Sequence, residues 1–133
     1  LTGLYNRKTF DEHLDRVLAH TSGGEEGQSA NHSPKRRHSP EHASNWLAII
    51  DIDHFKQIND RHGHLIGDEV LVLLARLMRN AFRLDDQLFR FGGEEFIVVL
   101  QASGGQNALN VLERFRRQVE THGFPMVGDV TIS

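Results

Sequence analysis

Two strand-like apolar runs in the middle of the chain are joined by a glycine-rich link, and this arrangement most constrains the fold. The runs are Gln87–Phe91 and Glu95–Leu100, with Gly92 and Gly93 between or beside them. A short glycine-containing link between two such runs is a typical β-hairpin signal. We therefore expect an antiparallel pair of strands at this point.

The patterns on either side of the hairpin alternate between helix and strand. Apolar residues at helical spacing predict helices over 6–20, 70–82 and 108–119, with a short helix within 51–60. The run Trp46–Ile50 is continuously apolar, which is typical of a central strand covered on both faces, and 127–133 begins a further strand. This order predicts an α/β fold, an α+β sandwich of the ferredoxin-like type with a mainly antiparallel sheet and flanking helices.

The length of 133 residues suits a single domain over 1–133. A polar stretch, Thr21–Asn45, interrupts it with many Ser, Gly, His and Pro residues and almost no apolar ones. We interpret this stretch as a loop insertion, because a structureless loop of such length is unusual inside a compact domain. The strand-like pattern is still running at Ser133, so we expect the C-terminal part of the domain to be absent from this chain.

Composition excludes several classes of function. The net charge of −3 lacks the basic footprint of a nucleic-acid-binding protein. The absence of cysteine excludes disulfides, thiolate catalysis and cysteine-bound zinc, and fits a cytoplasmic domain. The apolar runs are too short to span a bilayer, so we expect no membrane contact from this part of the protein. Membrane anchoring of a longer protein stays open.

Four acidic residues stand at the ends of predicted strands. Asp51 and Asp53 follow the run Trp46–Ile50, and Glu94 and Glu95 lie at the hairpin link. If the two strands are neighbours, these acids converge at one end of the sheet. Carboxylate oxygens of this kind bind hard cations such as Mg²⁺, which bridge the phosphate oxygens of a substrate.

The glycines of the link suit a substrate site as well. Gly92 and Gly93 carry no side chain, so a bulky ligand can approach the backbone closely. The alternative is that acids at strand ends and turns are merely solvated, and the hairpin alone is weak evidence for a site. The second acidic cluster strengthens the hypothesis of a ligand site.

Four segments together carry a resemblance to a known family: LTGLYNR (1–7), DIDHFKQIND (51–60), GHLIGDE (63–69) and RFGGEEF (90–96). In this order and spacing they resemble the GGDEF family of bacterial diguanylate cyclases. These enzymes condense two GTP molecules into cyclic di-GMP and release two pyrophosphates. The resemblance implies a nucleotidyl cyclase-like fold, a Mg²⁺ or Mn²⁺ cofactor, and a homodimer in which two bound GTP molecules face each other.

The resemblance also implies roles for the acids. Asp51, the main-chain carbonyl of Ile52 and Glu94 match the metal ligands. Glu95 matches an acid that binds metal or helps to deprotonate the ribose 3′-hydroxyl. Asp53 matches a supporting position, although a carboxylate that caps the next helical turn explains it equally well.

Nucleotide-binding roles follow from the same resemblance. Asn59 and Asp68 match guanine-reading positions, and a carboxylate can accept the N1–H and N2–H₂ donors of guanine. Without the resemblance, Asp68 reads as the N-cap of the following helix. Phe55 and Lys56 match positions near the base pocket and the triphosphate. In the family, the stretch beyond the equivalent of Ser133 continues a strand and then supplies a helix whose basic residues hold the triphosphate.

A second site is implied upstream of the hairpin. Arg83 and Asp86 form an R-x-x-D pattern that five residues separate from Gly92, which matches the family's inhibitory site for the product. Arg114 resembles a secondary contact for the same ligand. Because Arg83 and Asp86 precede the strand Gln87–Phe91, they lie at the opposite end of it from the acids. The alternative is a helix-terminal arginine beside a loop aspartate.

The function we expect is therefore that of a diguanylate cyclase restrained by its own product. The alternative is a catalytically degenerate receptor that binds cyclic di-GMP through Arg83 and Asp86, although the intact GGEEF sequence at 92–96 argues against it. A third reading is a dimerising module with a solvated acidic hairpin that binds no nucleotide.

Overall fold

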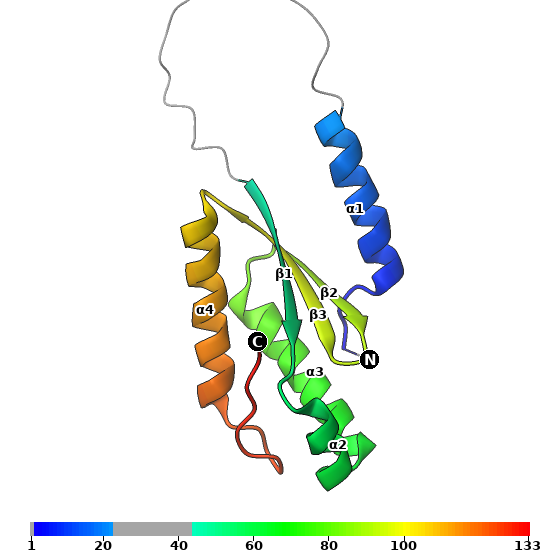
Figure 1. Cartoon of the computed structure of the whole chain (residues 1–133), viewed down its shortest axis with the longest axis vertical. Coiled ribbons are helices and arrows are strands. Elements are labelled where there is room, and N and C mark those ends of the chain that lie inside the picture. The colour runs from blue at the N-terminus through cyan, green and yellow to red at the C-terminus, as the bar shows by residue number, and fades with distance from the viewer. Residues whose placement is uncertain (1, 23–43) are drawn as a thin grey trace, which may run out of the picture.

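A computed structural model describes residues 2–22 and 44–133 (Figure 1). The elements are α1 (Arg7–Ser22), β1 (Ser44–Asp51), α2 (Phe55–His62), α3 (His64–Ala81), β2 (Gln87–Gly92), β3 (Glu95–Ala102) and α4 (Gly105–His122). Their order confirms the predicted α/β fold with a central hairpin. The further strand predicted over 127–133 is wrong in the described residues, where the pairing of Ile132 with Ile52 is an isolated bridge. Of the predicted insertion at 21–45, residues 23–43 lie outside the described residues, and its two ends belong to α1 and β1.

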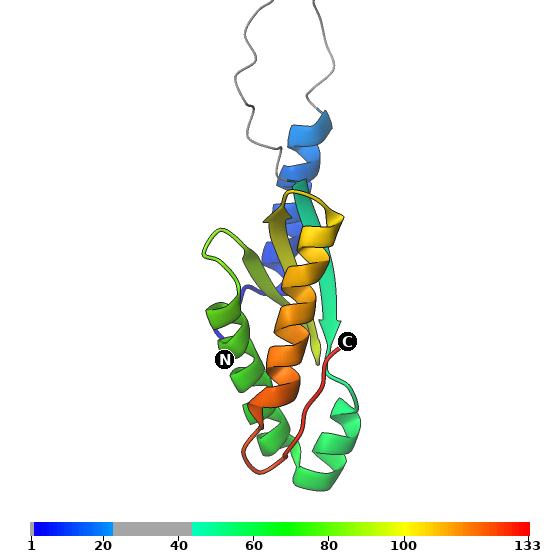
Figure 2. The ribbon, with the colours of Figure 1, turned by 90° about the vertical axis from the view of Figure 1, so that its left-hand side faces the viewer.

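The three strands form one antiparallel sheet in the order β1-β3-β2. Short pairings extend both of its edges. Tyr5 pairs in parallel with Phe89 of β2, and Ile132 pairs antiparallel with Ile52, just after β1. Figure 2 shows α4 on one side of the sheet and α1 on the other.

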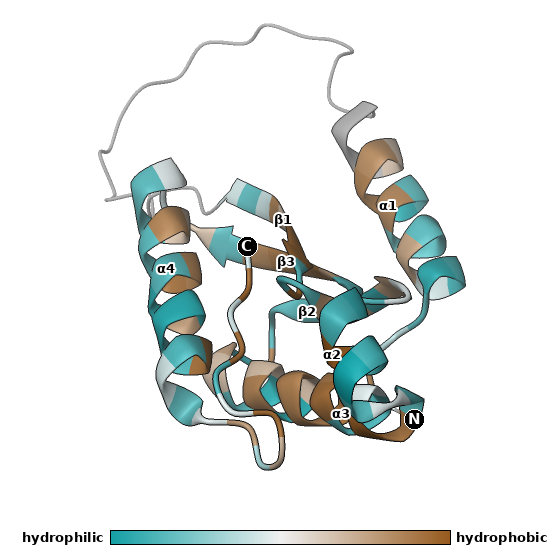
Figure 3. Ribbon diagram, turned by 60° about the horizontal axis from the view of Figure 1, so that its bottom comes forward, coloured by the Kyte–Doolittle hydropathy of each residue, from teal (hydrophilic) through white to brown (hydrophobic). Residues whose placement is uncertain are grey.

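The main core lies between the sheet and the pair α3 and α4. Alternate residues of β3, namely Phe96, Val98 and Leu100, are buried in this core. The opposite face of β3 carries Ile97, which is buried with Phe10 of α1 and Phe89 in a smaller cluster. This alternation follows from the two-residue period of a strand. Figure 3 shows hydrophobic residues gathered in α3 and in the strands, while α2 is mostly hydrophilic.

The expectation that Trp46–Ile50 is a central strand covered on both faces is wrong. The second hairpin strand, β3, lies between β1 and β2 and takes the covered position, so β1 lies at an edge of the three-stranded sheet. Leu47 and Ile49 of β1 are 49% and 63% exposed. In the described residues, the outer side of β1 is paired where Asp51 meets Ser133.

Helix α3 begins six residues before the predicted start at Val70. It starts at His64, directly after Gly63, whose φ of 86° is a conformation that glycine adopts readily. The Gly63 main-chain N–H closes α2 by donating to the Asn59 carbonyl at 2.7 Å. Asp68 therefore lies inside α3, and its interpretation as an N-cap is wrong.

Across the two described ranges, no helix combines the length and the apolar character that a bilayer crossing needs.

Candidate active site at one end of the sheet

Three carboxylates meet where β1 ends and the hairpin turns. The register of the sheet sets Asp51 directly opposite Glu95 on the neighbouring strand. Glu94 precedes Glu95 in the turn and is partly buried. Burial raises the pKa of the Glu94 carboxyl, and the negative charges of Asp51 and Glu95 raise it further. The structure thus brings the acids of two separate segments within electrostatic reach of one another.

This cluster has an unmet electrostatic requirement. The Asp51 Oδ1 atom is buried and has no hydrogen-bond partner. A buried polar atom without a partner costs about 1–3 kcal/mol, and more when it is charged. Repulsion among the three acids adds to that cost. A divalent cation bound here would offset both the cost of the unpartnered buried oxygen and the repulsion among the acids.

The donor set fits Mg²⁺ or Mn²⁺. Among the described residues, no group of three Asp, Glu or His side chains is arranged to hold a metal by itself. Mg²⁺ does not need such a cage, because it usually binds one or two carboxylates together with substrate phosphates and water. Asp51, Glu94 and the carbonyl of Ile52 would supply the protein's share of the ligands.

The hairpin glycines are not needed for the conformation of the free chain. Gly92 ends β2, and the turn itself is formed by Gly93 and Glu94. Neither glycine has a positive φ, and a Cβ atom added to either would meet nothing within 4 Å. What the two glycines leave is open space above the backbone, next to the carboxylates.

Asp53 is held by residues from the far end of the chain. Its carboxylate accepts hydrogen bonds from Thr131 Oγ1 at 2.8 Å and Ser133 Oγ at 2.6 Å. The hydrogen bond from Ser133 is the largest cause that lowers the pKa of Asp53. The N-cap of α2 is His54, without a side-chain cap, so the capping interpretation of Asp53 is wrong. Asp53 supports the end of β1 instead.

The predicted base-binding residues lie on α2 and α3. Phe55 is buried at the start of α2, Lys56 beside it is exposed, and Asn59 follows within the same helix. Asp68 is exposed on α3 and lines a cavity of about 700 Å³. Asn59, Phe55 and Lys56 are not among the residues that line this cavity, although Gly67, next to Asp68, lies against Asn59 and Phe55.

Sequence reasoning missed Gly67, where α2 and α3 meet closely. A Cβ atom at Gly67 would stand 1.8 Å from Asn59 Oδ1 and 3.4 Å from Phe55 Cζ. The Asn59 Oδ1 atom is buried without a hydrogen-bond partner. A glycine inside an amphipathic helix costs stability, and this cost was the signal that could have identified the position. Gly67 leaves the space that the Asn59 side chain occupies.

The predicted R-x-x-D site forms a separate cavity at the opposite end of β2. Arg83, Asp86 and Arg114 all line this cavity of about 530 Å³. The Asp86 carboxylate accepts hydrogen bonds from the main-chain N–H of Arg83 at 2.9 Å and of Gln101 at 3.4 Å. The side chains of Arg83 and Arg114 are exposed. Two distant segments thus bring two guanidinium groups and a fixed carboxylate to one hollow.

A family model described as "Diguanylate cyclase, GGDEF domain" matches residues 1–132. The chain belongs to the GGDEF family. The GGDEF domain is 38% identical over 131 residues to the diguanylate cyclase DgcP of Pseudomonas aeruginosa, with 97% of this chain covered. It is 33% identical over 132 residues to the probable diguanylate cyclase DgcC of Escherichia coli K12, with 99% covered.

A solved relative confirms the fold of this GGDEF domain. The GGDEF domain of DgcB from Caulobacter crescentus, crystallised in complex with c-di-GMP, is similar with a TM-score of 0.77 and 30% sequence identity. The similarity covers 98% of this chain and 70% of that chain. The present chain spans 17% of DgcP and 31% of DgcC, so it corresponds to a minor part of these two curated relatives.

Proposed function

We propose that this GGDEF domain is a diguanylate cyclase that condenses two GTP molecules into cyclic di-GMP and two pyrophosphates. The observation that carries the proposal is the carboxylate cluster, in which Asp51 has a buried oxygen without a partner and the pKa of Glu94 is raised. Such a cluster destabilises the free chain and serves a bound cation. GTP is a cytoplasmic substrate, so we assign the domain to the cytoplasm.

In this proposal Asp51, Glu94 and the Ile52 carbonyl hold Mg²⁺ or Mn²⁺ against the triphosphate. The ion supplies charge stabilisation on the phosphate oxygens as the transfer proceeds. Glu95, which is exposed and lies opposite Asp51 in the register of the sheet, accepts the proton of the ribose 3′-hydroxyl. The hydroxyl oxygen attacks the α-phosphate of the GTP held by the partner domain, and pyrophosphate leaves. Each product molecule therefore requires a homodimer.

The remaining residues bind and orient GTP. Asn59 and Asp68 read the guanine edge, from α2 and from α3 respectively. Lys56 is exposed and meets the triphosphate as a point charge. The open space over Gly92 and Gly93 admits the nucleotide to the carboxylates.

Product feedback is part of the proposal. Cyclic di-GMP carries two phosphates and two guanines, and the cavity of Arg83, Asp86 and Arg114 offers matching groups. Arginine binds phosphate or the guanine edge through its planar fork, and a carboxylate accepts guanine N–H groups. Bound product would restrain the pairing of two domains from a site remote from the carboxylates.

The decisive experiment incubates the full-length protein encoded by the gene with GTP and Mg²⁺ and separates the nucleotides by liquid chromatography. We expect cyclic di-GMP and pyrophosphate in a ratio of one to two, and no cyclic product from ATP alone. A protein that binds GTP with Mg²⁺ but never forms cyclic di-GMP would contradict the cyclase assignment.

A receptor function is the second candidate, because the cavity at Arg83 does not depend on the carboxylate cluster. A receptor would bind cyclic di-GMP in calorimetry and form none from GTP. The Asp51 and Glu94 carboxylates would then have no ligand to offset their repulsion, which is why we favour the cyclase.

We expect Gly67→Ala to weaken GTP binding by roughly tenfold to hundredfold, equivalent to about 1.4–2.8 kcal/mol. The new methyl group would displace the Asn59 amide, because it would stand 1.8 Å from Asn59 Oδ1. Calorimetry with a non-hydrolysable GTP analogue measures the effect. Asn80→Ala, at an exposed position near the end of the same helix, is the matched control. Wild-type affinity in the Gly67 variant would show that Asn59 does not read the base.

A further inference from the structure

The hairpin turn is held by an arginine to which neither the sequence patterns nor the proposed mechanism gives a role. Arg90 of β2 donates two hydrogen bonds to the carbonyl oxygen of Gly93, from Nη2 at 2.9 Å and from Nε at 3.3 Å. Its own main-chain N–H donates to the carbonyl of Tyr5 at 2.8 Å. The backbone of Arg90 is therefore anchored in the sheet while its side chain reaches forward to the turn.

A β-bulge directly precedes the turn. The pairing of β2 with β3 shifts register between Arg90 and Gly92, so Phe91 is an extra residue in the ladder. Such bulges bend a strand and redirect the residues that follow. Gly92 and Gly93 have no side chains, and the space around their Cα atoms is open. Glycine at both positions leaves the backbone with a wide choice of conformations.

A hydrogen bond to the Gly93 carbonyl acts directly on Glu94. The Gly93 C=O and the Glu94 N–H belong to the same planar peptide unit. When the oxygen of this unit is held by two donors, the unit resists rotation, and the Glu94 Cα atom at its far end is held in place with it. The position of that Cα atom sets where the side chain starts, and so how closely the carboxylate can approach Asp51.

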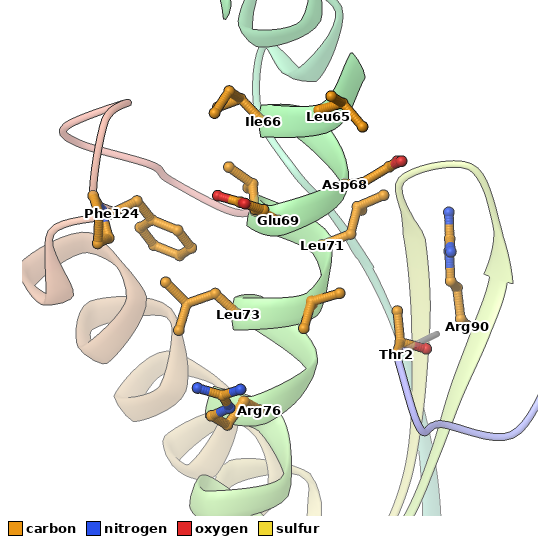
Figure 4. A pocket seen from close by; sticks show the side chains of 13 residues that line it. Thr2, Leu65, Ile66, Asp68, Glu69, Leu71, Leu73, Arg76, Arg90 and Phe124 are labelled. Carbon is orange, nitrogen blue, oxygen red and sulfur yellow. The ribbon is translucent and has the colours of Figure 1, made fainter. Parts of the chain in front are cut away.

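We propose that Arg90 is a positioning residue for the turn, which aligns the Glu94 carboxylate with Asp51 by holding the Gly93 carbonyl. This inference rests on the proposed function, since it assigns Arg90 to the same metal-binding site. The effect comes from two directed hydrogen bonds and does not require the positive charge to touch substrate or metal. Arg90 also lines the cavity that contains Asp68, across from α3 (Figure 4).

Three substitutions separate a positioning role from an electrostatic one. Arg90→Met removes every donor. Arg90→Gln removes the charge, but its Nε2 lies the same number of bonds from the backbone as Arg90 Nε, so it can keep one hydrogen bond to Gly93. Arg90→Lys keeps the charge and loses the planar fork. Arg76→Met removes an equal charge from the same cavity on α3 and is the matched control.

The readouts are Mn²⁺ affinity, measured by electron paramagnetic resonance with a non-hydrolysable GTP analogue, and amide hydrogen exchange at Glu94 and Glu95. We expect Arg90→Met to weaken Mn²⁺ binding about tenfold or more and to speed this exchange, as the loss of charge-assisted hydrogen bonds predicts. Arg90→Gln should recover part of both effects. In turnover, kcat should fall more than the KM for GTP changes, because the guanine is held by other residues.

Wild-type Mn²⁺ affinity and exchange in Arg90→Met would overturn the proposal. So would full recovery by Arg90→Lys together with none by Arg90→Gln, because charge alone would then explain the effect. Unchanged binding of cyclic di-GMP, whose cavity is at the other end of β2, verifies that each variant is folded. If the wild-type protein forms no cyclic di-GMP, the hydrogen-exchange and Mn²⁺ measurements still test the role of Arg90. A failure of the cyclase assignment can therefore be told apart from a failure of this proposal.

Discussion

Glu94→Gln should lower the rate of cyclic di-GMP formation by about a thousandfold or more, a change of roughly 4 kcal/mol in the activation barrier. The amide is nearly isosteric with the carboxylate but carries no negative charge for the cation. Asp51 would then be the sole carboxylate of the proposed ligand set, and the ion would be held too weakly to stabilise the transferring phosphate. Chromatography of the GTP reaction measures the loss. Residual turnover within tenfold of wild type would contradict the assignment of Glu94.

The same substitution should leave the fold intact and, without metal, stabilise it at neutral pH. The pKa of Glu94 is raised in the folded chain, so the stabilising contribution of this group is present below its unfolded pKa and is lost as pH rises through the folded pKa. As pH rises through the folded pKa of Glu94, the metal-free wild-type protein should therefore lose stability. Thermal unfolding should show a smaller loss over the same pH range in Glu94→Gln. Glu12→Gln, at an exposed acid on α1, should reproduce the wild-type profile. Mg²⁺ should stabilise wild type more than Glu94→Gln.

Arg83→Ala should weaken the binding of cyclic di-GMP by about a hundredfold, because a charge-assisted contact to phosphate or guanine contributes roughly 1.5–3 kcal/mol. Calorimetry with the product measures this loss, and the inhibition constant in the cyclase assay should rise in parallel. Arg83 is a cleaner target than Asp86, whose carboxylate also accepts the Arg83 and Gln101 N–H groups and so supports the local backbone.

A matched control for Arg83 is Arg117→Ala. Arg117 is an exposed arginine on α4, it pairs with Glu113 at 3.2 Å, and it does not line the product cavity. Cyclic di-GMP should bind to this variant as it does to wild type. If Arg83→Ala binds the product as tightly as Arg117→Ala does, the cavity at the end of β2 is not the product site.

Local patterns in the sequence predicted the element types, and tertiary placement accounts for the errors. The hairpin, α3 and α4 have strong periodicities, which arise from the face that each element buries. The run Trp46–Ile50 reads as a covered strand, yet the order β1-β3-β2 leaves Leu47 and Ile49 exposed. A window of five residues carries no information about which strand lies between the other two.

The candidate site was partly predictable for a similar reason. The convergence of Asp51 with Glu95 needs two strands to be neighbours, a condition that the apolar runs leave open and that the register of the sheet meets. The close packing of Gly67 on Asn59 and the reach of Arg90 to the Gly93 carbonyl depend on side-chain geometry across separate elements. Neither contact has a signature in periodicity or spacing, so both are visible only in the folded structure.

The anchoring of Asp53 bears on the order in which the proposed site is completed during synthesis. The hydrogen bond from Thr131 to Asp53 joins positions 78 residues apart, and the main chain of Asp51 pairs with Ser133. Contacts between such distant positions form late, because a long segment must be ordered before they contribute. On the ribosome, the proposed metal-binding end of the sheet would stay incomplete until Ser133 had left the exit tunnel. A nascent chain would thus form its local helices first and the anchor of Asp53 last.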